Sequence, residues 1–284
     1  MEKAFFFENE GFRLFGYLHD PESRITGCDG EISYGMVLCP PFGDEHIPSY
    51  RILRNFAVQL CKEGIPVLRF DYRGYGDSEG EIEVATPETQ VSDIRKAIEV
   101  LRNITGVKAV GLLGLRLGGT LALLASQLEP VTQFVILWAP ILSPEVYFQG
   151  ILRQQIFSVM VNREKRSTVK QLTSELKQGG KVDIGGFYLL GKVYNAFCGI
   201  DFLKLLQQVR QPVHIAIVGR EVATMDKSVI DRLKNMCKND VAAVVVHEEP
   251  FWRYGSNTYV PPPTRLMKET IDWLSAVSFH RIFS

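Results

Sequence analysis

The chain has 284 residues, enough to bury one large core or one core with a covering subdomain. Its 32 lysine and arginine residues balance 32 aspartate and glutamate residues, and no basic run stands out, which argues against a nucleic-acid or anionic-membrane partner. A small-molecule or protein partner is therefore expected.

The N-terminal segment becomes polar within a few residues, so it lacks the apolar centre of a secretory signal peptide. No apolar stretch reaches the roughly 20 residues that span a bilayer. The five cysteines are scattered without the spacing of metal ligands. We expect a soluble, cytoplasmic protein with reduced thiols, without a transmembrane segment, a metal site or a cofactor.

The first predicted element is a hairpin, because residues 4–8 and 12–19 alternate in polarity around a turn at Gly11. Short apolar runs then alternate with stretches in which apolar residues recur every three or four positions, the pattern of a mostly parallel sheet covered by helices. The predicted strands are 35–39, 66–70, 108–113, 134–138, 213–218 and 242–246. The predicted helices are 50–62, 89–103, 118–128, 227–237 and 263–276.

Residues 140–212 are too many for an ordinary connection between elements and predict a lid inserted into the core, which residues 1–139 and 213–284 form. Within the lid, 144–161 and 167–178 predict helices, and 183–190 an extended segment. We expect the aromatic side chains of the lid to form the apolar wall of a pocket: Phe148, Phe157, Phe187, Tyr188, Tyr194 and Phe197.

A sharp strand-to-helix turn is predicted at Gly114-Leu115-Arg116-Leu117-Gly118. This segment resembles the nucleophile elbow G-x-S-x-G of the α/β-hydrolases, with arginine in place of serine. Residues 37–43 resemble the strand and loop that contribute an oxyanion-hole N–H, and residues 69–78 resemble the D-x-R-G-x-G-x-S segment of the same superfamily. The resemblance covers the chain outside the lid. It implies an α/β-hydrolase fold, with a mostly parallel central sheet, helices on both faces and a helical lid insertion.

Three further details resemble the hydrolase-like proteins associated with exosortase systems. They are Pro40-Pro41-Phe42 followed by Glu45, the sequence G-L-R-L-G, and Pro250-Phe251-Trp252. This resemblance implies descent from hydrolases and leaves open whether the chain hydrolyses any substrate.

The resemblance places the catalytic triad at Arg116, Glu221 and Pro250, none of which is the usual group. A guanidinium stays protonated and cannot attack a carbonyl. His247 lies three residues before the histidine position and is interpreted as a strand-end residue, while Glu221 is one position out of register. A degenerate triad is therefore predicted.

Other polar residues are given structural roles. Asp71, Arg73 and Asp77 are expected to hold their loop by hydrogen bonds, and Cys39 to be an inert core thiol. His46 and His214 lack a second ligand at metal spacing.

Two interpretations of Arg116 remain open. Its place at a helix N-terminus suits an anion, so the functional interpretation is a ligand pocket. That pocket would use Arg116, Leu117, Phe42, Gly43, Glu45 and Glu249, with Arg220 or Arg253 as a further cation. In the other interpretation, Glu45, Glu221 or Glu249 neutralises Arg116 internally, since a buried unpaired guanidinium is costly. The function classes are accordingly a ligand-binding protein, an enzyme with Glu45 or Glu249 as acid/base, and a scaffold that keeps only the fold.

Overall fold

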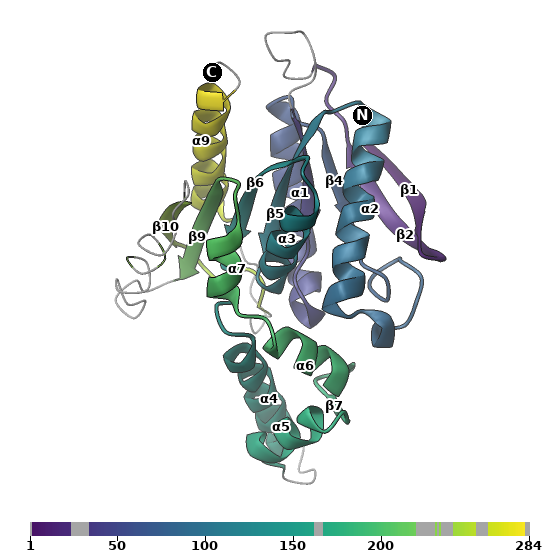
Figure 1. The fold of residues 1–284 in the computed structure, drawn as a ribbon. Helices are drawn as coiled ribbons and strands as arrows, with labels where there is room; N and C mark the ends of the chain where they lie inside the picture. The colour runs from purple at the N-terminus through teal and green to yellow at the C-terminus, as the bar shows by residue number, and fades with distance from the viewer. Residues whose placement is uncertain are drawn as a thin grey trace.

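A mixed eight-stranded sheet forms the centre of the computed structural model (Figure 1), with strand order β1-β2-β4-β3-β5-β6-β9-β10. The structure describes residues 2–23, 34–161, 167–219, 231, 233, 241–253 and 261–281. The pairs β1–β2 and β2–β4 are antiparallel, and every other neighbouring pair is parallel. The expected edge hairpin and mostly parallel sheet are therefore confirmed.

The central strands are buried on both sides, which explains their continuous apolar sequences. All residues of β3 and β4, and all but the first of β5, are buried. The strands of the sheet are β1 (Glu2–Asn9), β2 (Phe12–His19), β3 (Tyr34–Cys39), β4 (Val67–Phe70), β5 (Ala109–Leu115), β6 (Thr132–Trp138), β9 (Val213–Gly219) and β10 (Val241–His247).

Helices cover both faces of the sheet (Figure 1). One face carries α1 (His46–Lys62) and α9 (Thr264–Arg281), and the other carries α2 (Pro87–Thr105), α3 (Leu117–Leu128) and α7 (Phe202–Gln208). The helix predicted at 227–237 lies almost wholly outside the described residues.

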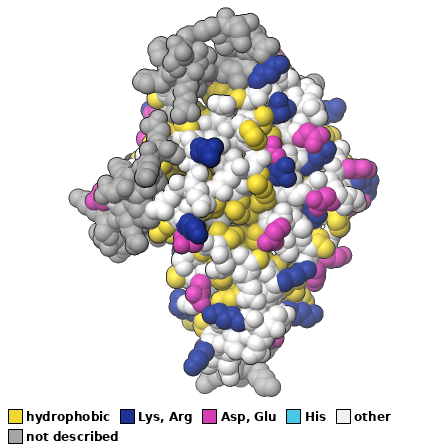
Figure 2. Space-filling model, in the orientation of Figure 1, with side chains coloured by type: hydrophobic (Ala, Val, Ile, Leu, Met, Phe, Trp, Pro, Cys, Tyr) yellow, Lys and Arg dark blue, Asp and Glu magenta, His cyan; other side chains and the backbone are white. Residues whose placement is uncertain are grey.

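The face with α2 and α3 carries no concentration of one charge. Figure 2 shows its lysine and arginine side chains interspersed with acidic ones around a band of hydrophobic side chains. Ile104 at the end of α2 and Leu128 at the end of α3 are among the exposed hydrophobic residues.

The segment predicted as a lid, residues 140–212, lies against the edge of the sheet at which the parallel strands end (Figure 1). Its elements up to residue 198 are called the lid below. Two short 3₁₀ helices, η1 (Gly43–Glu45) and η2 (Ile82–Val84), lie in loops of the core. The elements of the lid are α4 (Pro144–Val161), α5 (Val169–Lys177), β7 (Lys181–Asp183), β8 (Tyr188–Leu190) and α6 (Gly191–Cys198). Both predicted lid helices are found, and the extended segment is a small hairpin of β7 and β8.

The helices α6 and α7 were not predicted, because a helix of about two turns has too little periodicity to be distinctive. Although α7 falls within the predicted lid range, it packs on α3 of the core, where the Gln127 side chain donates to the Leu205 carbonyl at 3.3 Å. No helix in the described ranges has both the length and the apolar character required to cross a bilayer.

Candidate functional site

The turn between β5 and α3 holds Arg116 in a strained conformation, with φ 58° and ψ −123°. A positive φ is unfavourable for a residue with a side chain. The flanking glycines are required by contact: a Cβ on Gly114 would meet the backbone of Gly118 and Gly119, and one on Gly118 would meet the carbonyls of Cys39 and Pro40. The sharp turn predicted from the sequence is confirmed, and it presents the Arg116 side chain at the end of the sheet.

The Arg116 guanidinium is held by four groups. Its Nε donates to Glu45 Oε1 at 3.1 Å, and its Nη1 donates to the Ala139 carbonyl at 3.2 Å. The guanidinium carbon lies 4.8 Å from the ring centre of Trp252 and 5.5 Å from that of Tyr147. Of the three expected carboxylate partners, Glu45 makes the ion pair, and Glu221 lies outside the described residues.

A pocket of about 980 Å³ opens beside this ion pair, between the loops at the sheet edge and the lid. Glu45, Arg116 and Trp252 line it from the core, and one face of α4 lines it from the lid. The described lining residues are Asp44, Glu45, Arg116, Pro140, Ile141, Leu142, Ser143, Val146, Tyr147, Gly150, Ile151, Arg153, Gln154, Gln155, Ile184, Gly185, Trp252 and Arg253.

Tyr147 and Trp252 enclose the guanidinium and were not predicted as site residues. The sequence could have indicated the α4 residues of the pocket, since Tyr147, Ile151 and Gln154 recur at helical spacing and all line it. Trp252 gives no such signal, because its position depends on the loop that follows β10.

The predicted oxyanion loop lies beneath a layer of aromatic rings. The Phe42 ring is 5.6 Å from Phe148, 6.3 Å from Phe187 and 6.0 Å from Phe197, measured between ring centres. A Cβ on Gly43 would be 2.7 Å from Phe187 Cζ. The lid therefore occupies the space directly above this loop.

The predicted ligand residues fall into two groups, those that line the pocket and those that do not. Glu45 and Arg116 line the pocket, whereas Phe42, Gly43 and Leu117 are not among its described lining residues, and Leu117 is fully buried. Glu249 follows β10 and is partly buried, outside the described lining.

The aromatic residues of the lid also fall into two groups, those packed near Phe42 and those exposed. Phe148, Phe187 and Phe197 face Phe42, and Tyr194 packs on Phe148 at 5.4 Å between ring centres. Phe157 and Tyr188, by contrast, are 71% and 46% exposed. None of the six lid aromatic residues predicted for this role is among the described residues that line the pocket, so the expectation that they form its apolar wall is wrong.

The segment at the predicted histidine position is a turn after β10. Pro250 accepts a hydrogen bond from the Arg253 amide at 3.3 Å, and His247 is exposed at the strand end. Glu248 accepts the amide of Arg265 at 2.7 Å and so caps the start of α9. None of the described residues that line the pocket is a histidine.

The pKa of Glu45 is shifted by its surroundings. Burial raises the pKa of this carboxyl, although the charges of Arg116 and Arg253 lower it. Burial also raises the pKa of Tyr147 well above its ordinary value, and the nearby Glu45 carboxylate adds to that effect. The pocket thus contains a carboxyl whose pKa burial raises above that of an ordinary glutamate.

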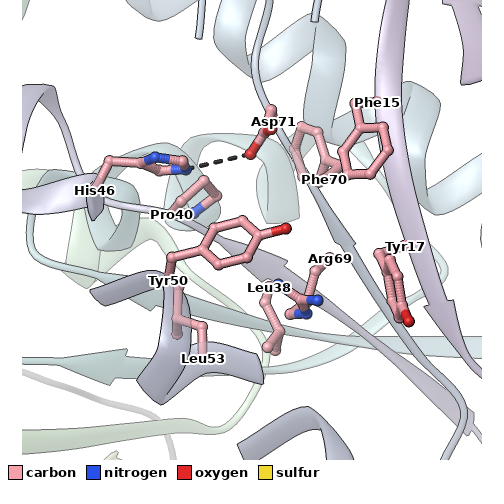
Figure 3. A pocket seen from close by; sticks show the side chains of 10 residues that line it. All are labelled: Phe15, Tyr17, Leu38, Pro40, His46, Tyr50, Leu53, Arg69, Phe70 and Asp71. Carbon is pink, nitrogen blue, oxygen red and sulfur yellow. Dashed lines mark ion pairs between the residues drawn. The ribbon is translucent and has the colours of Figure 1, made fainter. Parts of the chain in front are cut away.

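A second, much smaller crevice lies between β2, β4 and α1 (Figure 3), with a volume of about 20 Å³. His46 Nε2 lies 3.3 Å from Asp71 Oδ1 there, and the Arg69 guanidinium lies between the rings of Tyr17 and Tyr50. This volume suits about one water molecule, which makes the larger pocket the candidate site.

The predicted loop-holding residues have structural partners. Asp71 accepts the Asp77 amide at 3.2 Å, and Arg73 Nη2 lies 2.7 Å from Asp93 Oδ1 in a buried ion pair. Cys39 is fully buried, and burial raises the pKa of its thiol, as expected for an inert core cysteine. His214 is also buried and stacks on Trp273, with 5.0 Å between ring centres.

Comparison with known proteins agrees with the fold. The family model of the serine aminopeptidases, S33, matches residues 43–181. A polyketide transferase, claH, of Penicillium crustosum is 29% identical over 143 residues, which are 49% of this chain and 44% of that protein. A thiohydrolase, aneE, of Aspergillus aculeatus is 29% identical over 142 residues, which are 46% of this chain and 45% of that protein. The matched segment thus spans less than half the length of these relatives.

Solved structures match the chain over nearly its whole length. Est1E from Butyrivibrio proteoclasticus with bound ferulic acid superposes with a TM-score of 0.68 at 16% identity, covering 96% of this chain and 98% of that one. The α/β hydrolase GrgF from Penicillium sp. sh18 gives 0.64 at 17% identity, covering 97% and 98%. The predicted α/β-hydrolase fold, with its mostly parallel central sheet and covering helices, is confirmed.

Proposed function

We propose that this chain, with its α/β-hydrolase fold, binds a small anionic, acyl-bearing ligand in the pocket beside Arg116 and does not act as a serine hydrolase. The observation that carries the proposal is a guanidinium at the base of a large pocket with an apolar wall from the lid. In this proposal the triad is degenerate, and the chain is a pseudoenzyme whose elbow binds instead of attacking.

The case against serine hydrolysis rests on three positions. Arg116 occupies the elbow and cannot form an acyl intermediate. Pro250, at the position that the resemblance gives to the histidine, has no group that could accept a proton. Phe187 fills the space above Gly43, where a hydrolase needs room for an oxyanion.

The case for an amphipathic ligand rests on the distribution of groups in the pocket. Arg116 offers a charge that recognises a carboxylate, and Arg153 and Arg253 add positive charge to the lining. Apolar side chains line the same space: Ile141, Leu142, Val146, Ile151 and Ile184. The volume of about 980 Å³ is at the upper end of ordinary small-molecule sites, so an acyl chain as well as its head group can enter.

Binding is tested by calorimetry and thermal shift with octanoate, with octanol as the neutral comparison ligand. Octanoate at about 100 times its Kd should stabilise the fold by about 2.7 kcal/mol, and octanol should stabilise it much less. Arg116→Gln should weaken octanoate binding at least about tenfold, equivalent to about 1.4 kcal/mol. The matched control is Arg95→Gln, because Arg95 is a half-exposed arginine that pairs with Glu129 on the surface, away from the pocket lining.

Two results would reject this function. One is equal affinity for octanoate and octanol, and the other is unchanged octanoate affinity in a folded Arg116→Gln variant. If that variant fails to fold, Arg116→Lys provides the test, since lysine keeps the charge and loses the planar fork.

A second candidate is an enzyme that uses Glu45 as general acid or base. It is favoured by the raised pKa of this buried carboxyl at the pocket wall. A panel of ester, thioester and amide substrates on purified protein tests it. Turnover that is lost in Glu45→Gln and kept in the surface variant Glu129→Gln would support it, and absence of turnover across the panel would reject it.

A further inference from the structure

Three buried polar atoms around the Arg116–Glu45 pair lack a hydrogen-bond partner in good geometry, although the Tyr147 hydroxyl lies close enough to Glu45 to lower the pKa of its carboxyl. They are Glu45 Oε2, Tyr147 Oη and Trp252 Nε1, and all three residues line the same pocket. Buried polar atoms are nearly always hydrogen-bonded, so a group of unsatisfied ones at a pocket marks a place for a ligand group. The atoms include an acceptor, an N–H donor and a hydroxyl that can do either.

A ligand carboxylate at this place would compete with Glu45 for the guanidinium. Glu45 Oε1 already accepts from Arg116 Nε, and the exposed fractions of the two side chains are only 16% and 14%. Two carboxylates beside one guanidinium in a buried site repel each other, so one of them must take up a proton.

The groups that face Glu45 indicate that Glu45, and not the ligand, is the carboxyl that takes up the proton. Arg116 approaches from the β5–α3 turn, Tyr147 from α4 and Arg253 from the loop after β10. Asp44, on the same 3₁₀ turn as Glu45, lines the pocket too, and Tyr75 acts on Tyr147. Burial raises the pKa of Glu45 in spite of the two arginines, and a second negative charge would raise it further.

We propose that the pocket binds an acyl monocarboxylate together with one proton taken from solvent, which neutralises Glu45. The ligand carboxylate then pairs with Arg116, and the protonated Glu45 donates a hydrogen bond to it. The Tyr147 hydroxyl and the Trp252 N–H are the remaining donors for its oxygens. This inference rests on the proposed function and adds to it a ligand class and a pH dependence.

The test is calorimetry of octanoate binding between about pH 6 and 8.5, where octanoate itself is ionised. At each pH the titration is repeated in buffers with different heats of ionisation. The expected result is an enthalpy that depends on the buffer and corresponds to uptake of up to one proton. In the upper part of this range the affinity should fall by up to about tenfold per pH unit.

The variant Glu45→Gln supplies the matched comparison. Glutamine donates through its amide as the protonated acid would, and it does not titrate. Octanoate should therefore bind this variant without proton uptake and with little dependence on pH. Glu129→Gln, which alters a surface carboxyl that pairs with Arg95 away from the pocket lining, should keep the wild-type proton uptake.

Each outcome decides one claim. Octanoate binding to the wild type without proton uptake overturns this inference and leaves the proposed function standing. Uptake that persists in Glu45→Gln overturns the assignment of the proton to Glu45. No binding of octanoate at any pH overturns both the inference and the proposed function. The wild-type titration decides the inference even if Glu45→Gln does not fold.

Discussion

The ring of Phe187 in the lid occupies the space that a side chain at Gly43 would fill, with Cζ 2.7 Å from the Cβ position. Gly43 itself has φ 62°, a left-handed conformation that favours glycine. The contact places an apolar ring directly against the loop that resembles the oxyanion-hole segment of the hydrolases. It leaves the Arg116 side of the elbow as the part that faces the large pocket.

Replacing Arg116 by serine should not create a working esterase. A serine without a base remains protonated and weakly nucleophilic. Even with an intact oxyanion hole, an enzyme that loses a triad member keeps a rate enhancement of only about 10³ to 10⁴ over water. Turnover of an activated ester and labelling by a serine-directed phosphonate should both stay near background, and adding Pro250→His should raise both. Turnover by the single variant at rates typical of enzymes would mean that a histidine such as His247 acts as base.

The aromatic layer should be important for stability. Phe148 is fully buried and packs on Phe42, Phe197 and Tyr194, so Phe148→Ala should cost about 3–5 kcal/mol. Phe157, on the same helix, is 71% exposed, and Phe157→Ala should change stability by no more than about 0.5 kcal/mol. Urea denaturation of the two variants measures the difference. Equal effects would show that the lid does not pack on the core as described.

The elbow glycines should not tolerate even alanine. A Cβ at position 118 would collide with the carbonyls of Cys39 and Pro40, which are backbone atoms, so Gly118→Ala should cost at least about 2 kcal/mol and reduce the soluble yield. Gly150 lies within α4 with nothing within 4 Å of its Cβ position. Gly150→Ala should therefore stabilise the protein by about 0.5–1 kcal/mol. Thermal unfolding of the two variants measures both changes in stability, and the reverse order of effects would contradict the prediction.

His214 should make the fold sensitive to acid. Burial lowers the pKa of His214 from 6.5 to about 4, so the folded protein binds fewer protons than the unfolded chain between these values. The stability that is present above pH 6.5 is thus lost as the pH falls toward 4. The full loss for this residue is roughly 3 kcal/mol as an upper limit.

His214→Phe should remove this part of the pH dependence, because phenylalanine does not titrate and can keep the stacking on Trp273. His19, whose pKa burial also lowers to about 4, should continue to contribute in the variant. Denaturation at pH 7 and pH 4.5 measures the change for each protein. His247→Gln at the exposed end of β10 is the control, and it should leave the acid sensitivity as it is. Identical pH profiles for wild type and His214→Phe would contradict the prediction.

The parts of this protein that depend on local rules could be predicted from the sequence. Continuous apolar runs mark strands buried on both faces, and the alternating segments around Gly11 mark the edge hairpin. Gly114 and Gly118 mark a turn that only residues without side chains permit, which places Arg116 at the edge of the sheet. Each of these features involves neighbours within a few residues or a periodicity within one element.

The chemistry of the site was decided by contacts between distant parts of the chain. Glu45 was one of three candidate partners for Arg116, and only the path of the loop before α1 brings its carboxylate to the guanidinium, 71 positions away. Tyr147 and Trp252 enclose the same group because the lid and the loop after β10 meet above the sheet. Phe187 covers Gly43 for the same reason. The residue types show which partners are chemically possible for Arg116. Which of them pairs with it depends on how the lid packs on the core, because burial and distance determine the energy of each pair.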